Sequence, residues 1–513
     1  MTSAADAATF AAVWCGGVED HPDSTFLIFE APDGVVSQWT YGEFDEEVGR
    51  VAALLVANGV GRGSAVHLAL TNCPTFVAIW LASVRLGAWI VPSDPMSRTP
   101  ELADHMGRTA PTVGFCSADR ADTYSAAMPD TMVVVEIDEA DALFGPFPAV
   151  GLAKSDGFER PAPAPQDRAA VVFTSGTTGR PKGVEISQAN YAFAGQTMAA
   201  ASDLAATDRQ LVVLPLFHVN AQYYSFASAI WAGASVALMH TFSASGFLGQ
   251  VARHQATCAS LFAAPIRMIL ARGEAIDGVG LRHCWFAQNL ADDQYDTFAR
   301  WIGCRPRQLY GMTETIPAVL TDHAEAPRAD SMGFVTGGCQ VEIHDAAGVP
   351  TADGEVGEIV VGGEPGITLF TSYLDDPETT DASYRGSWFG TGDRASRDAD
   401  GRFFFDGRRS DVLKVAGENV STVEVEAVLT SHPLILEASV VGAADPIRDE
   451  VPVAFVVAAD AANPPTVEAL QEWCQQHLAK VKQPRDYTLL DELPRTSVGK
   501  IRKFILKREV DAR

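Results

Sequence analysis

The sequence has few basic residues and lacks the cysteine patterns of metal sites. Across 513 residues, 38 Lys and Arg stand against 65 Asp and Glu, so the formal net charge is −27. Nucleic-acid binding needs a basic face that neutralises phosphates, and this composition argues against that class. The eight cysteines form no Cys-x-x-Cys pair and no His/Cys ligand spacing. We therefore expect no zinc site, but reduced thiols of a cytoplasmic protein.

The sequence also lacks a secretory signal and a clear membrane span. Its N-terminus, MTSAADAATF, has no basic region followed by an apolar stretch, so we expect no secretory signal. The segment 221–242 contains no Asp, Glu, Lys or Arg, yet it includes Gln222 and His240 and is interrupted by Gly233. A helix followed by a buried strand fits this pattern better than a bilayer span. We expect a soluble protein.

What the sequence does contain is an alternation of helical and strand patterns. At 513 residues, with 47% apolar and 20% charged residues, the chain is long enough for at least two globular domains. The runs AVHLALTN (65–72), FVAIWLASVRLG (76–87) and AWIVPSD (88–94) read as strand, helix and strand, and QLVVLPLF (210–217) and ASVALMH (234–240) continue the series. This alternation predicts an α/β fold with largely parallel sheets.

The sequence pattern changes at two places along the chain. RPAPAPQDR (160–168) is a proline-alanine connector that leads into AAVVFTS, a predicted buried strand. After residue 340, VEIHD, GEIVVGG and RFFFDGR read as antiparallel strands. We predict a large N-terminal domain (1–407) of layered sheets and helices with a β-rich subdomain. A boundary at 408–411 in GRRSD then precedes a small α+β C-terminal domain (412–513).

The stretch TSGTTGRPKG, residues 174–183, directly follows that buried strand. Successive backbone N–H groups of a glycine-rich turn form a concave site for phosphate oxygens, and the loop adds four hydroxyls and two cations. It is no Walker A loop, because here the lysine precedes the glycine. The stretch is typical of a phosphate-binding loop rather than of a Ser/Thr/Gly linker.

Six further motifs follow this loop in order. They are LPLFHVN (214–220), LYGMTET (309–315), GEIVVGG (357–363), TGD (391–393), GRRSDVLKVAGENVSTVEVE (407–426) and PRTSVGK (494–500). Together with FTSGTTGRPKG they closely resemble the signatures of the adenylate-forming superfamily, which includes acyl- and aryl-CoA synthetases. The resemblance covers nearly the whole chain. The AQNLADD stretch at 287–293 is similar to the carnitine/crotonobetaine type of acyl-CoA ligase.

The resemblance implies a two-step reaction that uses ATP, Mg²⁺ and coenzyme A. A carboxylate first attacks the α-phosphorus of ATP to give acyl-AMP and pyrophosphate, and a thiol then displaces AMP. Because both reactants of the first step are anions, the protein must position them and neutralise charge. Glu314 is the implied Mg²⁺ ligand, Thr313 the α-phosphate contact and Tyr310 the adenine contact. Asp393 would accept both ribose hydroxyls, with Arg408 as a second contact.

Further residues are implied for the nucleotide. The strip that contacts adenine is usually rich in Gly and Ala in the family, whereas this chain has Gln288 and Asn289. SYLDDPETT (372–380) likewise lacks the Gly-Tyr pair that often occurs there. The implied nucleotide-binding residues are Thr174, Ser175, Gly176, Thr177, Thr178, Gly179, Lys182, Ala287, Gln288, Asn289, Tyr310, Gly311, Met312, Thr313, Asp393, Arg408 and Lys500.

The small domain is implied to serve both steps. Lys500 would reach the α-phosphate and the ligand carboxylate during adenylation, and Ser410 is the hinge about which the domain then rotates. Lys414, Gly417 and Glu418 would line the tunnel for the thiol, with His218 as the gate between this tunnel and the acyl pocket. The tail from 480 to 513, with ten Lys/Arg and five Asp/Glu, is a candidate anion-facing element that suits the phosphates of CoA.

The substrate is expected to be an apolar carboxylic acid without an α-amino group, which includes alkyl, aryl and polycyclic acids. Amino-acid-activating relatives place an Asp just after the aromatic residue of the LPLF-type motif, where this chain has His218, Val219 and Asn220. A buried ammonium without a partner would be costly. The candidate acyl-pocket residues are mostly apolar and comprise His218, Gln222, Gly311, Met312, Ile316 and Pro317.

Two alternatives stay open beside an acyl-CoA synthetase. The first is a stand-alone ligase that loads a carrier protein instead of CoA. The second is a catalytically inactive relative that only binds acyl or nucleotide ligands. The presence of Glu314, Asp393, Arg408 and Lys500 argues against the second.

Overall fold

The fold is taken from a computed structural model that describes residues 8–139, 162–174, 181–408, 412–415, 418–446, 448–495 and 501–512. The chain divides into two compact units. Unit 1 comprises Met1–Val341 and Val361–Phe389, and unit 2 comprises Glu342–Val360 and Gly390–Arg513. The boundary predicted at 408–411 falls largely outside the described residues, so the domain limits stay a prediction.

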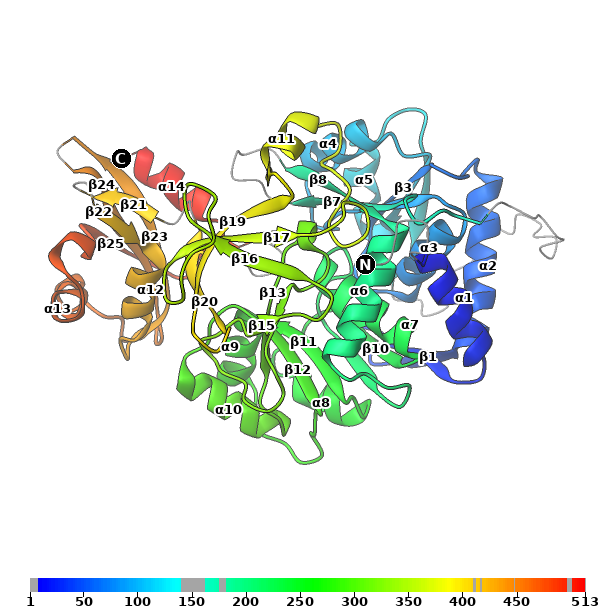
Figure 1. Cartoon of the computed structure of the whole chain (residues 1–513). Coiled ribbons are helices and arrows are strands. Elements are labelled where there is room, and N and C mark those ends of the chain that lie inside the picture. The colour runs from blue at the N-terminus through cyan, green and yellow to red at the C-terminus, as the bar shows by residue number, and fades with distance from the viewer. Residues whose placement is uncertain are drawn as a thin grey trace. The chain divides into compact units, whose positions relative to one another are not determined.

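Unit 1 contains a nine-stranded sheet, which Figure 1 shows in green and blue. In spatial order its strands are β15 (Phe334–Val335), β14 (Leu320–Thr321), β13 (Arg307–Tyr310), β12 (His283–Ala287), β11 (Cys258–Phe262), β9 (Arg209–Val212), β10 (Ser235–Met239), β1 (Thr25–Glu30) and β2 (Val36–Thr40). The strands from β13 to β1 pair in parallel, and β2, β14 and β15 are antiparallel to their neighbours. The central strands are buried on both faces, as parallel strands usually are.

A six-stranded sheet forms the second layer of unit 1. Its order is β6 (Val133–Ile137), β5 (Val113–Ser117), β3 (Ala65–Ala69), β4 (Trp89–Pro92), β7 (Arg168–Thr174) and β8 (Lys182–Ser187). All pairs are parallel except β7 with β8, which form an antiparallel hairpin. The predicted strands at 65–72, 88–94 and 169–175 are confirmed as β3, β4 and β7, and so is the largely parallel pairing.

Helices cover the faces of these sheets. The helices and helical turns of unit 1 are α1 (Phe10–Asp20), α2 (Tyr41–Ala57), α3 (Pro74–Arg85), α4 (Thr99–Thr109), η1 (Ala118–Arg120), α5 (Ala121–Ser125), α6 (Gln188–Ala201), η2 (Asn220–Ala227), α7 (Ser228–Ala232), α8 (Phe247–Arg253), α9 (Ala263–Arg272), α10 (Asp292–Ile302), η3 (Thr313–Thr315) and α11 (Pro377–Ala382). Helices α8, α9 and α10 pack on β9–β12 through one apolar core (Figure 1), and α4 and α5 pack on β3 and β5. Helices α1, α2, α3, α6 and α7 pack against one another.

The uncharged segment 221–242 folds as a helical stretch followed by a strand, which confirms its interpretation. It runs through the π-helical η2 and α7, turns at Gly233 with φ +67°, and enters the buried strand β10. A side chain at Gly233 would overlap the His21 ring, so both the turn and its packing require glycine. Among the described residues no helix is long and apolar enough to cross a membrane. All eight cysteines are free thiols.

A further sheet contains the strands predicted after residue 340. It comprises β16 (Gln340–His344), β17 (Gly357–Gly362), β18 (Tyr384–Arg385), β19 (Trp388–Arg397) and β20 (Phe403–Arg408), and the division between the units falls within β16, β17 and β19. Within unit 2, β19 and β20 pair antiparallel, as the pattern predicted.

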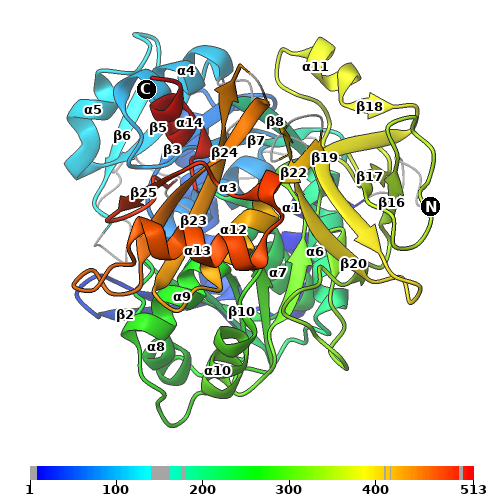
Figure 2. The same cartoon turned by 90° about the vertical axis from the view of Figure 1, so that its left-hand side faces the viewer.

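The remainder of unit 2 is an α+β fold, shown in orange and red in Figure 2. Its sheet has the order β22 (Glu418–Ser421), β21 (Val412–Val415), β24 (Asp449–Ala458) and β23 (Ile435–Asp445), with β25 (Asp486–Leu490) on β24. Its helices are α12 (Thr422–Thr430), α13 (Val467–His477), η5 (Lys480–Lys482) and α14 (Lys503–Asp511). Alternate residues of β23 and β24 contact α12 and α13 on one face and α14 on the other.

Candidate active site

Two of the predicted nucleotide segments meet at one edge of the nine-stranded sheet. Strands β12 and β13 are parallel neighbours, with Trp285 opposite Arg307 and Phe286 opposite Gln308. Residues 287–289 therefore leave the sheet beside residues 310–313. Ligands of open α/β sheets bind outside the carboxyl ends of the strands. The structure brings the predicted adenine strip and the LYGMTET motif together at such an edge.

The adenine strip is held through its backbone. Gln308 Nε2 donates to the carbonyl of Gln288 at 3.0 Å and to Asn289 Oδ1 at 3.2 Å. Arg267 donates to the carbonyl of Asn289 at 2.8 Å. Gln288 has φ +75°, a region that favours glycine, and such outliers concentrate at functional sites. The exposed Gln288 thus adopts a left-handed backbone conformation that usually favours glycine.

Glu314 is a buried carboxylate with defined hydrogen bonds. It lies in η3, the short turn after β13, and is 4% exposed. The backbone N–H of Phe370 donates to its carbonyl at 2.9 Å, and the Tyr373 hydroxyl donates to its Oε1 at 3.0 Å. A buried charge is tolerated only when it is hydrogen-bonded or paired. The carboxylate is therefore fixed in one orientation.

The surroundings of Glu314 fit Mg²⁺. Among the described residues no cluster of three or more His, Cys, Asp or Glu forms a complete cage for a metal. Mg²⁺ in nucleotide enzymes is typically held by one or two carboxylates together with phosphates and water. Glu314 supplies such a carboxylate next to the buried Thr313, which offers a second oxygen.

The predicted phosphate loop joins the two strands of an antiparallel hairpin. Thr174 ends β7, Lys182 begins β8, and the two residues are opposite each other in the ladder. Lys182 Nζ lies 4.5 Å from the centroid of the Tyr373 ring. Since Tyr373 also contacts Glu314, the cation after the loop and the predicted metal ligand share one neighbour.

Both flanks of the loop are held by helix α4. The Arg108 guanidinium lies 4.8 Å from the centroid of the Phe173 ring and donates to the carbonyl of Pro181 at 2.7 Å. The His105 ring stacks on Phe173 at 4.0 Å, and burial lowers the pKa of His105 to about 4, so this imidazole is neutral. One helix turn thereby fixes the residues just before and just after the loop.

The predicted acyl-pocket residues after β13 pack closely. A Cβ at Gly311 would lie 2.9 Å from Pro317 O and from Ala318 Cα, so this close approach requires glycine. Ile316 is fully buried. The backbone N–H of Met312 donates to Thr315 Oγ1 at 3.0 Å. Gly311, Met312, Ile316 and Pro317 thus belong to one compact turn next to Glu314.

His218 and Gln222 belong to the segment that follows β9. The N–H of Asn220 donates to His218 Nδ1 at 3.2 Å, and the His218 ring meets that of Phe262 edge-on at 5.7 Å. Gln222 is fully buried, accepts from the Tyr191 hydroxyl and donates to the carbonyl of Leu216 at 2.6 Å. These bonds give the Gln222 amide a role in shaping this segment, and its place in the acyl pocket stays a prediction.

Asp393 and Arg408 lie side by side in unit 2. They are opposite residues of β19 and β20, and Arg408 Nε is 3.0 Å from Asp393 Oδ1. The Asp393 carboxylate is buried, whereas the Arg408 side chain is 53% exposed. Gly392, with φ +73°, forms the turn before Asp393 and donates to Glu358. The carboxylate and guanidinium predicted for the ribose thus form one pair.

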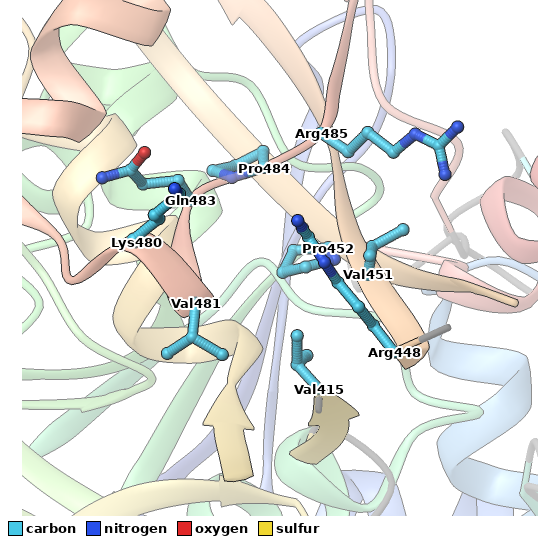
Figure 3. A pocket seen from close by; sticks show the side chains of 9 residues that line it. All are labelled: Val415, Arg448, Val451, Pro452, Lys480, Val481, Gln483, Pro484 and Arg485. Atoms are coloured by element: carbon cyan, nitrogen blue, oxygen red, sulfur yellow. The ribbon is translucent and has the colours of Figure 1, made fainter. Parts of the chain in front are cut away.

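Unit 2 also contains a pocket lined by three cations (Figure 3). Arg448 reaches across its middle, with Lys480 on one side and Arg485 on the other. Arg485 is paired with Asp445 at 2.9 Å, whereas in the described part of the chain neither Arg448 nor Lys480 has an anionic partner. The other lining residues are Val415, Val451, Pro452, Val481, Gln483 and Pro484.

The pocket adjoins two of the predicted tunnel residues. Lys414 and Glu418 are exposed residues of β21 and β22, which pair antiparallel, and Val415 of the same hairpin lines the pocket. The Lys414 N–H donates to Glu450 at 3.0 Å. The remaining predicted site residues lie outside the described residues: Ser175, Gly176, Thr177, Thr178, Gly179, Ser410, Gly417 and Lys500.

Several residues at these sites carried no clear signal in the sequence. Arg108 is a single cation at the end of a helix, and nothing in its neighbourhood points to the loop 70 residues later. Tyr373 stands in the SYLDDPETT stretch, which departs from the family pattern, and its partner Glu314 is distant in the sequence. Arg448, which precedes β24, and Lys480, in η5, are distant in the sequence and line one pocket only in the folded unit.

Comparison with known proteins agrees with this arrangement. The profile of the AMP-binding enzyme family matches residues 16–374, and that of the AMP-binding enzyme C-terminal domain matches residues 424–500. Crotonobetaine/carnitine–CoA ligase of Salmonella paratyphi A is 34% identical over 507 residues, which cover 96% of this chain and 98% of that protein.

Two solved structures share the fold over nearly the whole chain. ATP-bound MatB from Rhodopseudomonas palustris has a TM-score of 0.87 at 25% identity and covers 98% of this chain and 99% of that one. O-succinylbenzoate coenzyme A synthetase (MenE) from Bacillus subtilis, solved with ATP and magnesium ion, has a TM-score of 0.83 at 27% identity, covering 96% and 99%. The chain therefore belongs to the AMP-binding enzyme family, the adenylate-forming superfamily, in its acyl-CoA synthetase branch.

Proposed function

We propose that this AMP-forming acyl-CoA synthetase activates an apolar carboxylic acid without an α-amino group and transfers the acyl group to free CoA. Its co-substrates are ATP and CoA, and it uses Mg²⁺. The observation that carries the proposal is the common edge of β12 and β13, where the adenine strip lies beside the turn 311–317, which contains the buried Glu314. A nucleotide and a small acid bound there would lie next to each other.

In the first step the chain holds two anions together. Mg²⁺ bound by Glu314 would neutralise phosphate charge. Lys182 and the N–H groups of the phosphate loop would bind the β- and γ-phosphates, and Thr313 the α-phosphate. Lys500 would contact the α-phosphate and the attacking carboxylate. Asp393 and Arg408, already paired in β19 and β20, would bind the ribose hydroxyls.

The class of acid follows from what surrounds the turn 311–317. Ile316, Ala318 and Val319 are buried and apolar, and His218, Val219 and Asn220 stand where amino-acid-activating relatives have an Asp. An α-ammonium bound there would have no carboxylate partner from this motif and would lose its hydration. This supports an acid without an α-amino group.

A panel of acids tests this choice. Pyrophosphate release with ATP and Mg²⁺ is measured for straight-chain fatty acids, benzoate, o-succinylbenzoate, crotonobetaine, carnitine and several amino acids. We expect the highest kcat/KM for an acid without an α-amino group, and for each apolar acid a value at least about tenfold above that of its α-amino analogue, since leaving a charged group unpaired costs more than about 1.4 kcal/mol. Preference for an amino acid would contradict the lack of an α-amino group, and preference for crotonobetaine or carnitine would contradict an apolar acid.

CoA is favoured as acceptor by the cationic pocket of unit 2. Within the described parts of the chain, Arg448 and Lys480 present cations without anionic partners, next to the hairpin that carries Lys414 and Glu418. CoA carries a diphosphate and a 3′-phosphate, whereas a carrier protein presents one phosphodiester. Two such cations in one pocket, with Arg485 as a third lining residue, therefore suit CoA better.

Replacing Arg448 or Lys480 with glutamine is expected to raise the KM for CoA about tenfold, because each change removes a charge-assisted hydrogen bond to phosphate. Pyrophosphate release from acid and ATP should stay within about twofold, since the pocket serves only the second step. Arg397→Gln, a change of the same charge at the exposed pair with Asp353, is the matched control. Unchanged KM values for CoA, or thioester formation only on a carrier protein, would contradict CoA as the acceptor bound here.

A further inference from the structure

The segment 370–374 connects strand β8 with the turn that contains Glu314. The N–H of Phe370 donates to the carbonyl of Glu314 at 2.9 Å, and the N–H of Leu374 donates to the carbonyl of Gly183 in β8 at 2.8 Å. Ser372 accepts from the N–H of Glu185 at 3.0 Å, and its hydroxyl donates to the Glu185 carboxylate at 2.9 Å. The segment is therefore bonded at one end to the LYGMTET turn and at the other to the strand that follows the loop.

Tyr373 is the side chain of this segment that contacts both functional groups. Its hydroxyl donates to Glu314 Oε1 at 3.0 Å, and Lys182 Nζ lies 4.5 Å from its ring centroid. The side chain is 5% exposed, and the Tyr373 N–H donates to Thr380 Oγ1 at 2.9 Å. Contacts within unit 1 thus fix both the backbone and the side chain of Tyr373.

The chemistry of tyrosine suits this place. The Tyr373 hydroxyl donates a hydrogen bond to the Glu314 carboxylate at 3.0 Å and brings no charge of its own. The face of the aromatic ring attracts the ammonium of Lys182 without neutralising it. In a direct Lys182–Glu314 ion pair the two charges would neutralise each other. Lys182 would then attract the phosphates less strongly, and Glu314 would attract the metal less strongly. Tyrosine orients both groups and leaves each with its full charge.

We propose that Tyr373 is a positioning residue, which sets the Glu314 carboxylate for Mg²⁺ and the Lys182 ammonium for the phosphates of ATP. This inference rests on the proposed nucleotide site and assigns to the SYLDDPETT stretch a role in nucleotide and metal binding. Outer-sphere hydrogen bonds of this kind orient metal-ligating carboxylates, and their loss typically lowers metal affinity about 10- to 100-fold.

Tyr373→Phe removes the hydroxyl and keeps the ring beside Lys182. Binding of Mn²⁺ in the presence of a non-hydrolysable ATP analogue, followed by the electron paramagnetic resonance signal of free Mn²⁺, should show a Kd raised about tenfold or more. The Mg²⁺ concentration for half-maximal pyrophosphate release should rise in parallel. The KM for CoA should stay unchanged, since that substrate does not contact the metal.

The chain offers a matched control. Tyr384 is another tyrosine of unit 1, and its buried hydroxyl has no hydrogen-bond partner in the described residues. Tyr384→Phe makes the same chemical change without removing a bond, so its Mn²⁺ Kd should equal that of the wild type. Tyr373→Leu, which also removes the ring, should additionally raise the KM for ATP.

Three outcomes would overturn the inference. The first is a Mn²⁺ Kd for Tyr373→Phe equal to that of the wild type, and the second is an equally large shift in Tyr384→Phe. The third is a fall in the unfolding temperature of Tyr373→Phe that accounts for the change in Kd. The metal measurement needs no acid substrate, so it remains decisive even when no acid in the panel releases pyrophosphate and the proposed function fails.

Discussion

Replacing Lys500 with alanine is expected to lower acid-dependent pyrophosphate release about 10²- to 10³-fold, because removing one preorganised charge at a transition state has an effect of this size. The motif PRTSVGK places this lysine after a glycine and within a tail of ten basic and five acidic residues. A cation is needed there because the carboxylate and the α-phosphate repel each other as they approach.

A second measurement separates the role of Lys500 from a loss of folding. Thioester formation from chemically prepared acyl-AMP and CoA should stay within about threefold of the wild-type rate, because charge neutralisation at the α-phosphate belongs to the first step. Lys507→Ala, which removes a cation of α14 that pairs with Asp511, is the matched control and should retain pyrophosphate release. A Lys500→Ala enzyme with near wild-type release would remove this residue from the mechanism.

Glu314→Gln should lower pyrophosphate release about 10²-fold or more and weaken its dependence on Mg²⁺. Glutamine keeps the size of the side chain and an oxygen that can accept from the Tyr373 hydroxyl, so the turn after β13 should stay folded. What is lost is the negative charge that holds the metal in a buried position. Release is measured across a Mg²⁺ series, with the unfolding temperature recorded beside it. Wild-type release with the same Mg²⁺ optimum would show that the metal binds elsewhere.

Much of the site could be predicted because adenylate-forming enzymes carry their chemistry in short contiguous motifs. Residues 287–289 and 310–314 leave neighbouring parallel strands, so their proximity follows once the strand order is known. The pair of Asp393 and Arg408 likewise follows from antiparallel pairing of the TGD and GRRSD strands. Local sequence was sufficient to indicate that these motif residues lie close together.

The supporting residues could not be predicted, because their partners are distant in sequence. Tyr373 contacts Glu314, 59 residues earlier, and Arg108 contacts Pro181, 73 residues later. Such contacts depend on how α4 and the segment 370–374 pack on the β7–β8 hairpin, and no local pattern encodes that. The left-handed backbone of Gln288 is similar, since the residue type gives no sign of it.

The limits 1–407, 408–411 and 412–513 likewise remain predictions from composition and motif. The compact units place Glu342–Val360 with the C-terminal part and Val361–Phe389 with the N-terminal part. The chain passes from one unit to the other and back, and its composition does not change at these crossings. Composition therefore could not predict the limits of the units.

The most direct test of the central claim is the product balance of one complete reaction. The best acid of the panel is incubated with ATP, Mg²⁺ and CoA, and acyl-CoA, AMP and pyrophosphate are quantified by mass spectrometry and a coupled phosphate assay. The account predicts equal amounts of all three products, with acyl-AMP accumulating when CoA is left out. Formation of ADP, or no pyrophosphate with any acid, would contradict it.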